Sequence, residues 1–394
     1  MKSLRIDKRV LTTILLSKIT VFIIIFLAYN FFPFNKTFHD VNFLNEKNEK
    51  ISLQSAFSTW DTQHYLFLSE KGYIRGNVSN AFFPLFPISI SILNNFLSNS
   101  FLSGIIVTNI FSAAGLIYFY LFCREYFKDK KLAFRSFILL LSFPTAFFFS
   151  LIYSESLFLF LASALFYYLY TKKYFLASIF ALFIPISRPV GILISLPYLT
   201  YWVYLNVSIA SQSFKKILSQ IVEKLLLNKR TYLILSPFLG FAAYFLFMQV
   251  STGSYLEILN VIKYYRAEWN VSNIFNPILF FVNLFFPDSP ALHGFTNSII
   301  DRVFFIFYLL LLYLIYKRLD KTMFVYALFF GMTPLLGSFM SYARYLLVVF
   351  PIFMIMAKIF SLNKYRLLFY PTVLLFVVIQ IIFLIMHSLN YWVA

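Results

Sequence analysis

The sequence predicts an all-α polytopic membrane protein. Hydrophobic residues make up 61% of its 394 residues, whereas charged residues make up only 12%. Soluble domains carry about 45–50% apolar and about 25% charged residues. Apolar runs recur along the whole chain, and a helix of about 20 residues is the usual way to cross a bilayer. An ordinary soluble enzyme and a disordered chain are both excluded, and we expect a single integral-membrane domain over residues 1–394.

The charge balance is strongly basic. The net charge is +18, from 33 Lys and Arg against 15 Asp and Glu. In a soluble protein this excess would indicate a nucleic-acid partner, but in a membrane protein basic residues mark the cytoplasmic ends of the spans. We therefore expect membrane lipids, and no nucleic acid, as partners. The single cysteine, Cys123, excludes an intramolecular disulfide.

About eleven stretches are predicted to span the membrane. They are residues 10–32, 101–122, 134–151, 155–171, 175–187, 190–205, 232–251, 303–316, 323–340, 345–360 and 367–389. The apolar stretch 82–97 is instead assigned to a juxtamembrane helix, because letting it cross would move the basic cluster at 124–135 to the outer side. The loops on the side of the N-terminus then carry most of the basic residues. This predicts a cytoplasmic N-terminus and a C-terminus on the outer side.

Three connecting segments are notable for their length. Residues 33–100 and 251–301 form the first and second non-cytoplasmic loops, and both mix aromatic, charged and proline residues. Loops this long in a compact domain are usually functional. Residues 206–231 are predicted to form an amphipathic helix on the anionic inner leaflet.

The first outer loop carries a group of residues suited to chemistry, namely Trp60, Asp61, His64 and Tyr65. If residues 59–71 are helical, Asp61, His64 and Tyr65 share one face. A carboxylate and an imidazole on one face provide a base and a partner for a phosphate or hydroxyl group. The alternative is that Asp61 caps the N-terminus of a juxtamembrane helix.

A second polar group, Tyr153, Ser154 and Glu155, lies at the outer turn between two spans. The flanking spans lack other charges, which favours a functional role for Glu155. The alternative is a helix cap, with Ser154 at the N-cap position.

Two isolated arginines lie at the outer ends of other spans. Arg188 precedes Pro189, which breaks a helix, and Arg344 precedes Tyr345. A lone arginine at such a place suits an anionic phosphate. The alternative is an arginine that snorkels to the membrane surface and fixes the end of a span.

The second outer loop adds Arg266 and Trp269, whose surroundings suit either sugar stacking or an interfacial aromatic belt. No glycine-rich phosphate loop, H-E-x-x-H zinc motif or G-x-S-x-G elbow occurs in the sequence. Any transferred group must therefore come from a donor within the membrane. The four histidines are too dispersed to indicate a metal site, so the metal remains unknown.

Several of these pieces recur together in one family. They are Trp60-Asp-x-x-His-Tyr with Gly72-Tyr73, the run Phe-Phe-Pro-Leu-Phe-Pro from Phe82, Phe143-Pro-Thr-Ala-Phe-Phe-Phe-Ser leading to Tyr-Ser-Glu-Ser, Ser187-Arg-Pro-x-Gly, and Arg344-Tyr-x5-Pro351. In order and approximate spacing, residues 55–355 resemble the PIG-V, or GPI mannosyltransferase II, family and its bacterial and archaeal relatives.

The resemblance implies a GT-C glycosyltransferase fold and a hexose donor of the polyprenyl (dolichyl) phosphate type, most simply the mannose form. It also implies a site on the non-cytoplasmic face, with Asp61 in the position of the catalytic carboxylate. The family's loop motif is often a pair of acids, but here the residue two before Asp61 is Thr59 and the residue two after it is Gln63, so only one acid is present. A divalent cation is therefore left open, as is the acceptor, which could be a glycolipid, a glycan or a protein.

The residues themselves support the same chemistry. Asp61 would accept the proton of an acceptor hydroxyl as that hydroxyl attacks the anomeric carbon with inversion. Arg188 and Arg344, with His64, would stabilise the departing polyprenyl phosphate, and Glu155 would orient sugar hydroxyls or an arginine.

Two other classes of protein stay open. A surface-glycan ligase or polymerase would use a polyprenyl diphosphate donor at the same kind of site. A lipid or sugar transporter would carry its ionisable groups near the bilayer midplane, where Lys18 is the one deep charge that the sequence offers.

Overall fold

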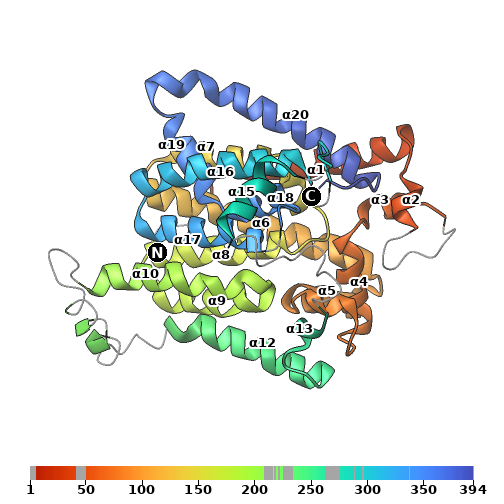
Figure 1. Cartoon of the computed structure of the whole chain (residues 1–394), viewed down its shortest axis with the longest axis horizontal. Helices are drawn as coiled ribbons and strands as arrows, with labels where there is room; N and C mark the ends of the chain where they lie inside the picture. The colour runs from red at the N-terminus through yellow and green to blue at the C-terminus, as the bar shows by residue number, and fades with distance from the viewer. Residues whose placement is uncertain are drawn as a thin grey trace.

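The computed structural model describes residues 6–40, 50–207, 234–261, 276–287, 289–294, 297–336 and 338–393, together with residues 216, 219, 220 and 222–224 (Figure 1). This part of the chain consists of helices and contains no β-strand. The predicted all-α class is therefore confirmed for the described residues.

The helices follow the hydropathy pattern. In the first half of the chain they are α1 (Lys8–Phe31), α2 (Lys36–His39), α3 (Leu53–Phe57), α4 (Asp61–Lys71), α5 (Leu85–Leu97), α6 (Ser100–Phe127), α7 (Lys130–Ser142), α8 (Glu155–Tyr170), α9 (Tyr174–Ser187) and α10 (Ser195–Asn206). In the second half they are α12 (Ser236–Thr252), α13 (Glu257–Val261), α15 (Pro277–Phe285), α16 (Ile299–Arg318), α17 (Lys321–Met332), α18 (Tyr342–Tyr345), α19 (Pro351–Ile359) and α20 (Phe369–Ser388). Short 3₁₀ turns join them at Val78–Ala81, Ala146–Phe149, Pro189–Ile194, Thr333–Leu336, Leu346–Val348 and Asn363–Leu368.

Each of the eleven predicted spans overlaps a helix, but the helices differ in length. Among the described residues, four helical segments are long and apolar enough to cross a membrane, namely Lys8–Phe31, Ser100–Phe127, Ile299–Arg318 and Asn363–Ser388. The number of candidate spans among the described residues rises to five if one bent pair of helical segments, Tyr342–Val348 and Pro351–Ile359, is counted as a single span. The number of spans and the orientation of the chain stay predictions.

Two predicted spans are not continuous helices. The stretch 134–151 is helical only as far as Ser142, where α7 ends two residues before Pro144. The stretch 345–360 is broken before Pro351, and its two parts meet at an angle of 81°. Proline lacks an N–H and restricts the residue before it, so helices tend to end at these points. Hydropathy alone does not detect such breaks.

Several helices begin at residues with a capping side chain. The carboxylates of Asp7, Asp129 and Asp320 accept hydrogen bonds from backbone N–H groups in the first turns of α1, α7 and α17. Such caps satisfy N–H groups that have no partner within the helix. The sequence therefore fixes where these three helices start.

The long helices lie side by side, and the short helices α2 to α5 gather at one end of the bundle, near the C-terminus (Figure 1). Helix α8 packs against both α6 and α9, and α20 packs against α1. The first predicted outer loop, residues 33–100, supplies the short helices at this end. Most of the predicted amphipathic segment 206–231 lies outside the described residues.

Close packing of α6 and α8 depends on a glycine. A side-chain carbon added at Gly115 would lie 2.8 Å from the backbone nitrogen of Phe160. Because that neighbour is backbone, it cannot move aside as a flexible side chain would, so only glycine fits at this crossing.

We expect Gly115→Ile to push α6 and α8 apart and to lower the free energy of unfolding by about 1–3 kcal/mol or more, as overpacking usually does. Thermal unfolding in mild detergent measures the effect. Ile110→Ala on the same helix, where the side chain is 60% exposed, is the matched control. Equal melting temperatures for the two variants would contradict this account of the crossing.

Candidate active site

Asp61 and Arg344 form an ion pair between α4 and α18. Asp61 is the first residue of α4, and its Oδ2 lies 3.0 Å from Nη1 of Arg344. The residue before it, Trp60, has a φ of 52°, which is uncommon for a bulky side chain. The Asp61 side chain is 27% exposed, whereas that of Arg344 is 9% exposed. Asp61 is the first residue of α4 and Trp60 is its N-cap, so the Asp61 carboxylate pairs with Arg344 instead of capping the helix.

Glu155 joins this pair to a second arginine. It is the first residue of α8, where the positive end of the helix dipole favours a carboxylate. Its Oε1 lies 3.0 Å from Nη2 of Arg188 and 3.3 Å from Nε of Arg344. The side chain of Glu155 is only 1% exposed. One buried oxygen therefore connects both guanidinium groups.

Arg188 lies at the end of α9, where Pro189 begins a 3₁₀ turn. Its side chain is 9% exposed, and its Nη1 has no hydrogen-bond partner among the described residues. The ring centroid of Tyr345 lies 5.8 Å from its Cζ atom and 5.6 Å from that of Arg344. Arg188 is therefore held inside the protein by Glu155, and it does not snorkel outward.

The four side chains form one cluster, which we call the charge cluster: Asp61, Glu155, Arg188 and Arg344. Isolated charges are very costly to bury, so pairing is a condition for holding them here. Two carboxylates balance two guanidinium groups. Asp61 is the most exposed member of the cluster. The structure thus brings together one residue from each of the four polar stretches in the sequence.

Hydrogen bonds hold the surrounding segments in register. The hydroxyl of Tyr65 donates to Oγ of Ser154 at 2.8 Å, and the hydroxyl of Tyr153 donates to the carbonyl of Thr59 at 3.2 Å. These contacts tie α4 to the turn before α8. Ser154 occupies the N-cap position of α8 without making a capping hydrogen bond from its side chain.

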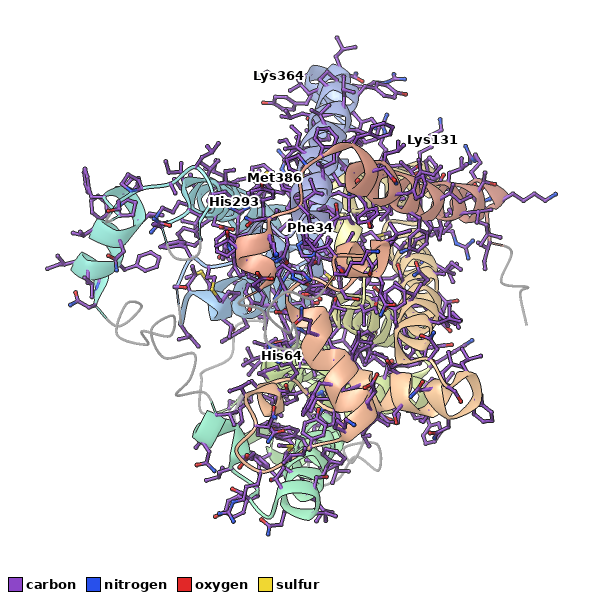
Figure 2. The ribbon with its side chains drawn as sticks, turned by 90° about the vertical axis from the view of Figure 1, so that its right-hand side faces the viewer. Phe34, His64, Lys131, His293, Lys364 and Met386 are labelled. Atoms are coloured by element: carbon purple, nitrogen blue, oxygen red, sulfur yellow. The ribbon has the colours of Figure 1, made fainter. Side chains whose placement is uncertain are left out.

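His64 lies on α4 at the end of the molecule that faces the viewer in Figure 2. Its Nδ1 is 2.9 Å from Oγ of Ser79, and its ring stacks on Phe82 with centroids 4.7 Å apart. Burial lowers the pKa of His64 to about 4, although the nearby charge of Asp61 opposes this shift. The imidazole of His64 is therefore neutral at pH 7.

Sequence reasoning missed two groups next to the cluster. Oδ1 of Asp301, which is fully buried, accepts a hydrogen bond of 2.9 Å from the backbone N–H of Ala343. It therefore fixes the backbone next to Arg344. Nε2 of His387 lies 2.9 Å from Oγ1 of Thr59, close to Tyr153. In the sequence, Asp301 appears as a lone acid and His387 as a lone histidine, each near the end of a predicted span. That signal could have marked them as candidates, but it does not identify the residues that they contact.

The aromatic residue before Asp61 also meets the C-terminal segment. The rings of Trp60 and Trp392 pack edge to face with centroids 5.0 Å apart. Of the predicted substrate-binding residues, Arg266 and Trp269 lie outside the described residues.

The cluster does not offer an obvious cation site. Asp61 and Glu155 are each paired with arginine. In the described part of the chain, no group of three or more His, Cys, Asp and Glu side chains is arranged to hold a metal ion. The carboxylates present therefore fit guanidinium partners better than a divalent cation.

Comparisons with known proteins come from a family model and from solved structures. The family model for mannosyltransferase (PIG-V) matches residues 6–281, which include Asp61, Glu155 and Arg188 but not Arg344. No curated protein matches the sequence.

The solved structures are distant in sequence. The chain is similar to the Archaeoglobus fulgidus oligosaccharyltransferase in the apo form, with 14% identity and a TM-score of 0.45, over 96% of this chain and 56% of that one. The archaeal oligosaccharyltransferase AglB, in complex with an inhibitory peptide and a dolichol-phosphate, gives 14% identity and a TM-score of 0.44, over 95% and 56%. The complex of the A. fulgidus enzyme with Zn and sulfate gives 14% identity and a TM-score of 0.48, over 93% and 53%.

This chain spans little more than half the length of those structures. The family model, in contrast, covers most of the chain. The chain therefore belongs to the mannosyltransferase (PIG-V) family of membrane glycosyltransferases.

Proposed function

We propose that the protein transfers mannose from a polyprenyl phosphate donor to a glycolipid, glycan or protein acceptor on the non-cytoplasmic face of the membrane, with inversion at the anomeric carbon. The observation that carries this proposal is the position of Glu155, whose Oε1 contacts both Arg188 and Arg344 beside the partly exposed Asp61. A base and two guanidinium groups are the groups that such a transfer needs.

Asp61 is the general base in this proposal. The acceptor hydroxyl attacks the anomeric carbon and its proton passes to the Asp61 carboxylate, while the bond between that carbon and the phosphate oxygen breaks. Attack from the side opposite the phosphate inverts the configuration, so a β-linked donor gives an α-mannoside. The 27% exposure of Asp61 leaves room for the hydroxyl to approach.

Arg188 and Arg344 receive the departing phosphate. The leaving group gains a negative charge as the bond breaks, and guanidinium groups in a site with little water stabilise that charge strongly. The free Nη1 of Arg188 is a donor that the described residues do not use. Glu155 fixes the orientation of both arginines, so that little reorganisation is needed during the reaction.

The location of the site follows from the predicted topology. We propose a multi-pass protein with a cytoplasmic N-terminus, a plasma-membrane location in a prokaryote and an endoplasmic reticulum location in a eukaryote. The charge cluster then lies toward the outer ends of α8 and α9, where a lipid-linked sugar would present its head group. The helical architecture is compatible with the GT-C fold that the family implies.

We expect Asp61→Asn to reduce transfer at least about 100-fold, because it removes the proton acceptor, while donor binding and folding are largely retained. Release of polyprenyl phosphate from purified protein, with a lipid and glycan extract as acceptor, measures the effect. Glu70→Gln, at the exposed far end of the same helix, is the matched control. Full activity of Asp61→Asn would remove Asp61 from the mechanism.

Arg188→Lys and Arg344→Lys keep the positive charge but lose the planar fork that binds phosphate at two points. We expect either change to weaken donor binding or turnover roughly tenfold, a typical value for one charge-assisted hydrogen bond. Steady-state kinetics over a range of donor concentrations measure this. The exposed Arg75→Lys is the control. If the two variants and the control have equal kinetics, neither arginine binds the donor.

The pKa of His64 predicts how stability responds to acid. The folded value, about 4, lies below the ordinary 6.5, so the unfolded chain binds more protons between these values. Stability should therefore fall as the pH is lowered from about 6.5 to 4. Thermal unfolding of wild type and His64→Gln across this range tests the point, and the variant should lose less stability. Parallel curves would show that His64 is not buried as a neutral group.

A further inference from the structure

Lys18 places a charge in the middle of α1, a helix that is otherwise apolar over its central part. Its side chain is buried, with the residue 9% exposed. The ammonium group donates to Oγ of Ser112 at 2.6 Å, to the carbonyl of Phe149 at 2.6 Å and to Oγ of Ser150 at 3.0 Å. Charges within membrane helices are costly and usually functional. All three donors of Lys18 are used within the protein, which does not suit a role in binding a transported ion.

The turn that Lys18 holds also touches the charge cluster. Phe149 and Ser150 follow directly after Phe148, whose ring centroid lies 5.4 Å from Cζ of Arg344. Tyr153 lies three residues after Ser150, and its ring centroid is also 5.4 Å from Cζ of Arg344. Glu155 follows at the start of α8. The hydrogen bonds of Lys18 thus end one residue away from a ring that packs on the guanidinium group.

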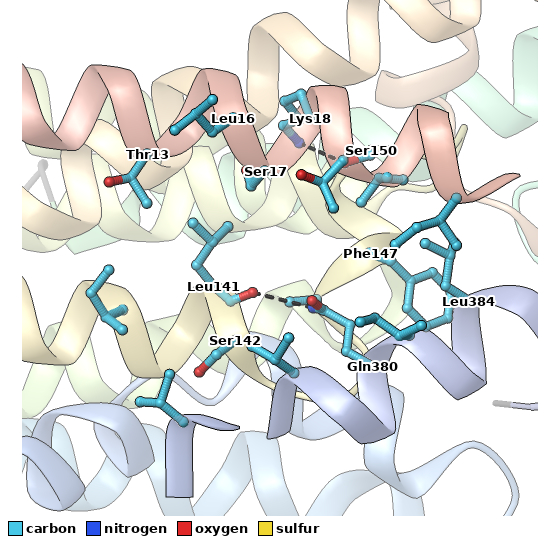
Figure 3. A pocket seen from close by; sticks show the side chains of 18 residues that line it. Thr13, Leu16, Ser17, Lys18, Leu141, Ser142, Phe147, Ser150, Gln380 and Leu384 are labelled. Carbon is cyan, nitrogen blue, oxygen red and sulfur yellow. Dashed lines mark hydrogen bonds between the residues drawn. The ribbon is translucent and has the colours of Figure 1, made fainter. Parts of the chain in front are cut away.

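A pocket lies beside the turn, on the side next to α1. A cavity of about 340 Å³ lies between α1, α7 and α20, and Lys18, Phe147 and Ser150 line it (Figure 3). Figure 3 shows the hydrogen bond from Lys18 to Ser150 at one wall of the cavity. At another wall, the side-chain amide of Gln380 donates a hydrogen bond to the carbonyl of Leu141. The turn itself is buried, with Phe147, Phe148 and Phe149 at most 1% exposed, so the hydrogen bonds of Lys18 act together with packing to hold it.

We propose that Lys18 is a positioning residue for the transfer reaction. Its ammonium group fixes the turn that carries Phe148 and Tyr153, and these two rings hold the Arg344 guanidinium between Asp61 and Glu155. This inference rests on the proposed function of the cluster. It assigns Lys18 to catalysis through Arg344, and not to contact with the substrate.

Lys18→Met removes the charge, and the neighbouring cavity leaves room for the new side chain. We expect kcat for polyprenyl phosphate mannose to fall about tenfold, while the donor KM changes less than about twofold, because Arg344 is needed most as charge builds on the phosphate. Lys8→Met, at the exposed cytoplasmic end predicted for α1, is the control. A merely structural role would lower the melting temperature but leave kcat per folded molecule unchanged.

A chemical rescue separates the charge from the shape of the side chain. Lys18→Cys is made in a Cys123→Ser background, so that the introduced thiol is the only one. A methanethiosulfonate reagent then adds either an ethylammonium group or a neutral group of the same length through the cavity. We expect the ammonium adduct, and not the neutral adduct, to restore most of kcat.

The outcomes distinguish this inference from the proposed function. If wild-type protein does not cleave the donor, the proposed function fails and this inference fails with it. If wild type cleaves the donor but Lys18→Met has an unchanged kcat, or both adducts rescue equally, only this inference is overturned. If Lys18→Met does not fold, Ser150→Ala, which removes one acceptor, should lower kcat, and an unchanged kcat would overturn the inference.

Discussion

The need to pair buried charges is the constraint on which the rest of the site depends. Glu155 is almost completely buried, and two arginines share one of its oxygens. Removing one partner from such a group leaves an uncompensated charge, which typically costs about 3–5 kcal/mol. The starts of α4 and α8, the end of α9 and the four-residue helix α18 must therefore converge. The cluster both specifies the arrangement of these four segments and provides groups that can act on a phosphate.

Irregular backbone makes that convergence possible. Prolines lie just beyond the ends of α7 and α9, and another follows the turn after α18. Helix ends and 3₁₀ turns, rather than the middles of long helices, carry the four charged side chains. The strained backbone of Trp60, with its positive φ, sits directly before Asp61, and such strain often accumulates at functional sites. The regular helices supply the frame, and the breaks between them direct side chains into one place.

Much of this could be predicted from the sequence, and the reasons for the remainder are physical. Asp61, Glu155, Arg188 and Arg344 stand out because charges are rare among apolar spans. Their mutual contacts, and those of Asp301 and His387, join segments up to several hundred residues apart, which local patterns do not encode. The hydropathy pattern also predicted helical positions correctly, because each of the eleven predicted spans overlaps a helix. It could not show that the stretch at 345–360 bends by 81°, because that angle depends on packing around Pro351.

The central claim is that a sugar linked to a lipid monophosphate reacts at the charge cluster. The most direct measurement presents purified wild-type protein with polyprenyl phosphate mannose, glucose and arabinose, and with a polyprenyl diphosphate sugar, each with the same acceptor extract. The account predicts release of polyprenyl phosphate from the mannose donor. Turnover of the diphosphate donor alone, or failure to bind or cleave any monophosphate donor, would contradict it.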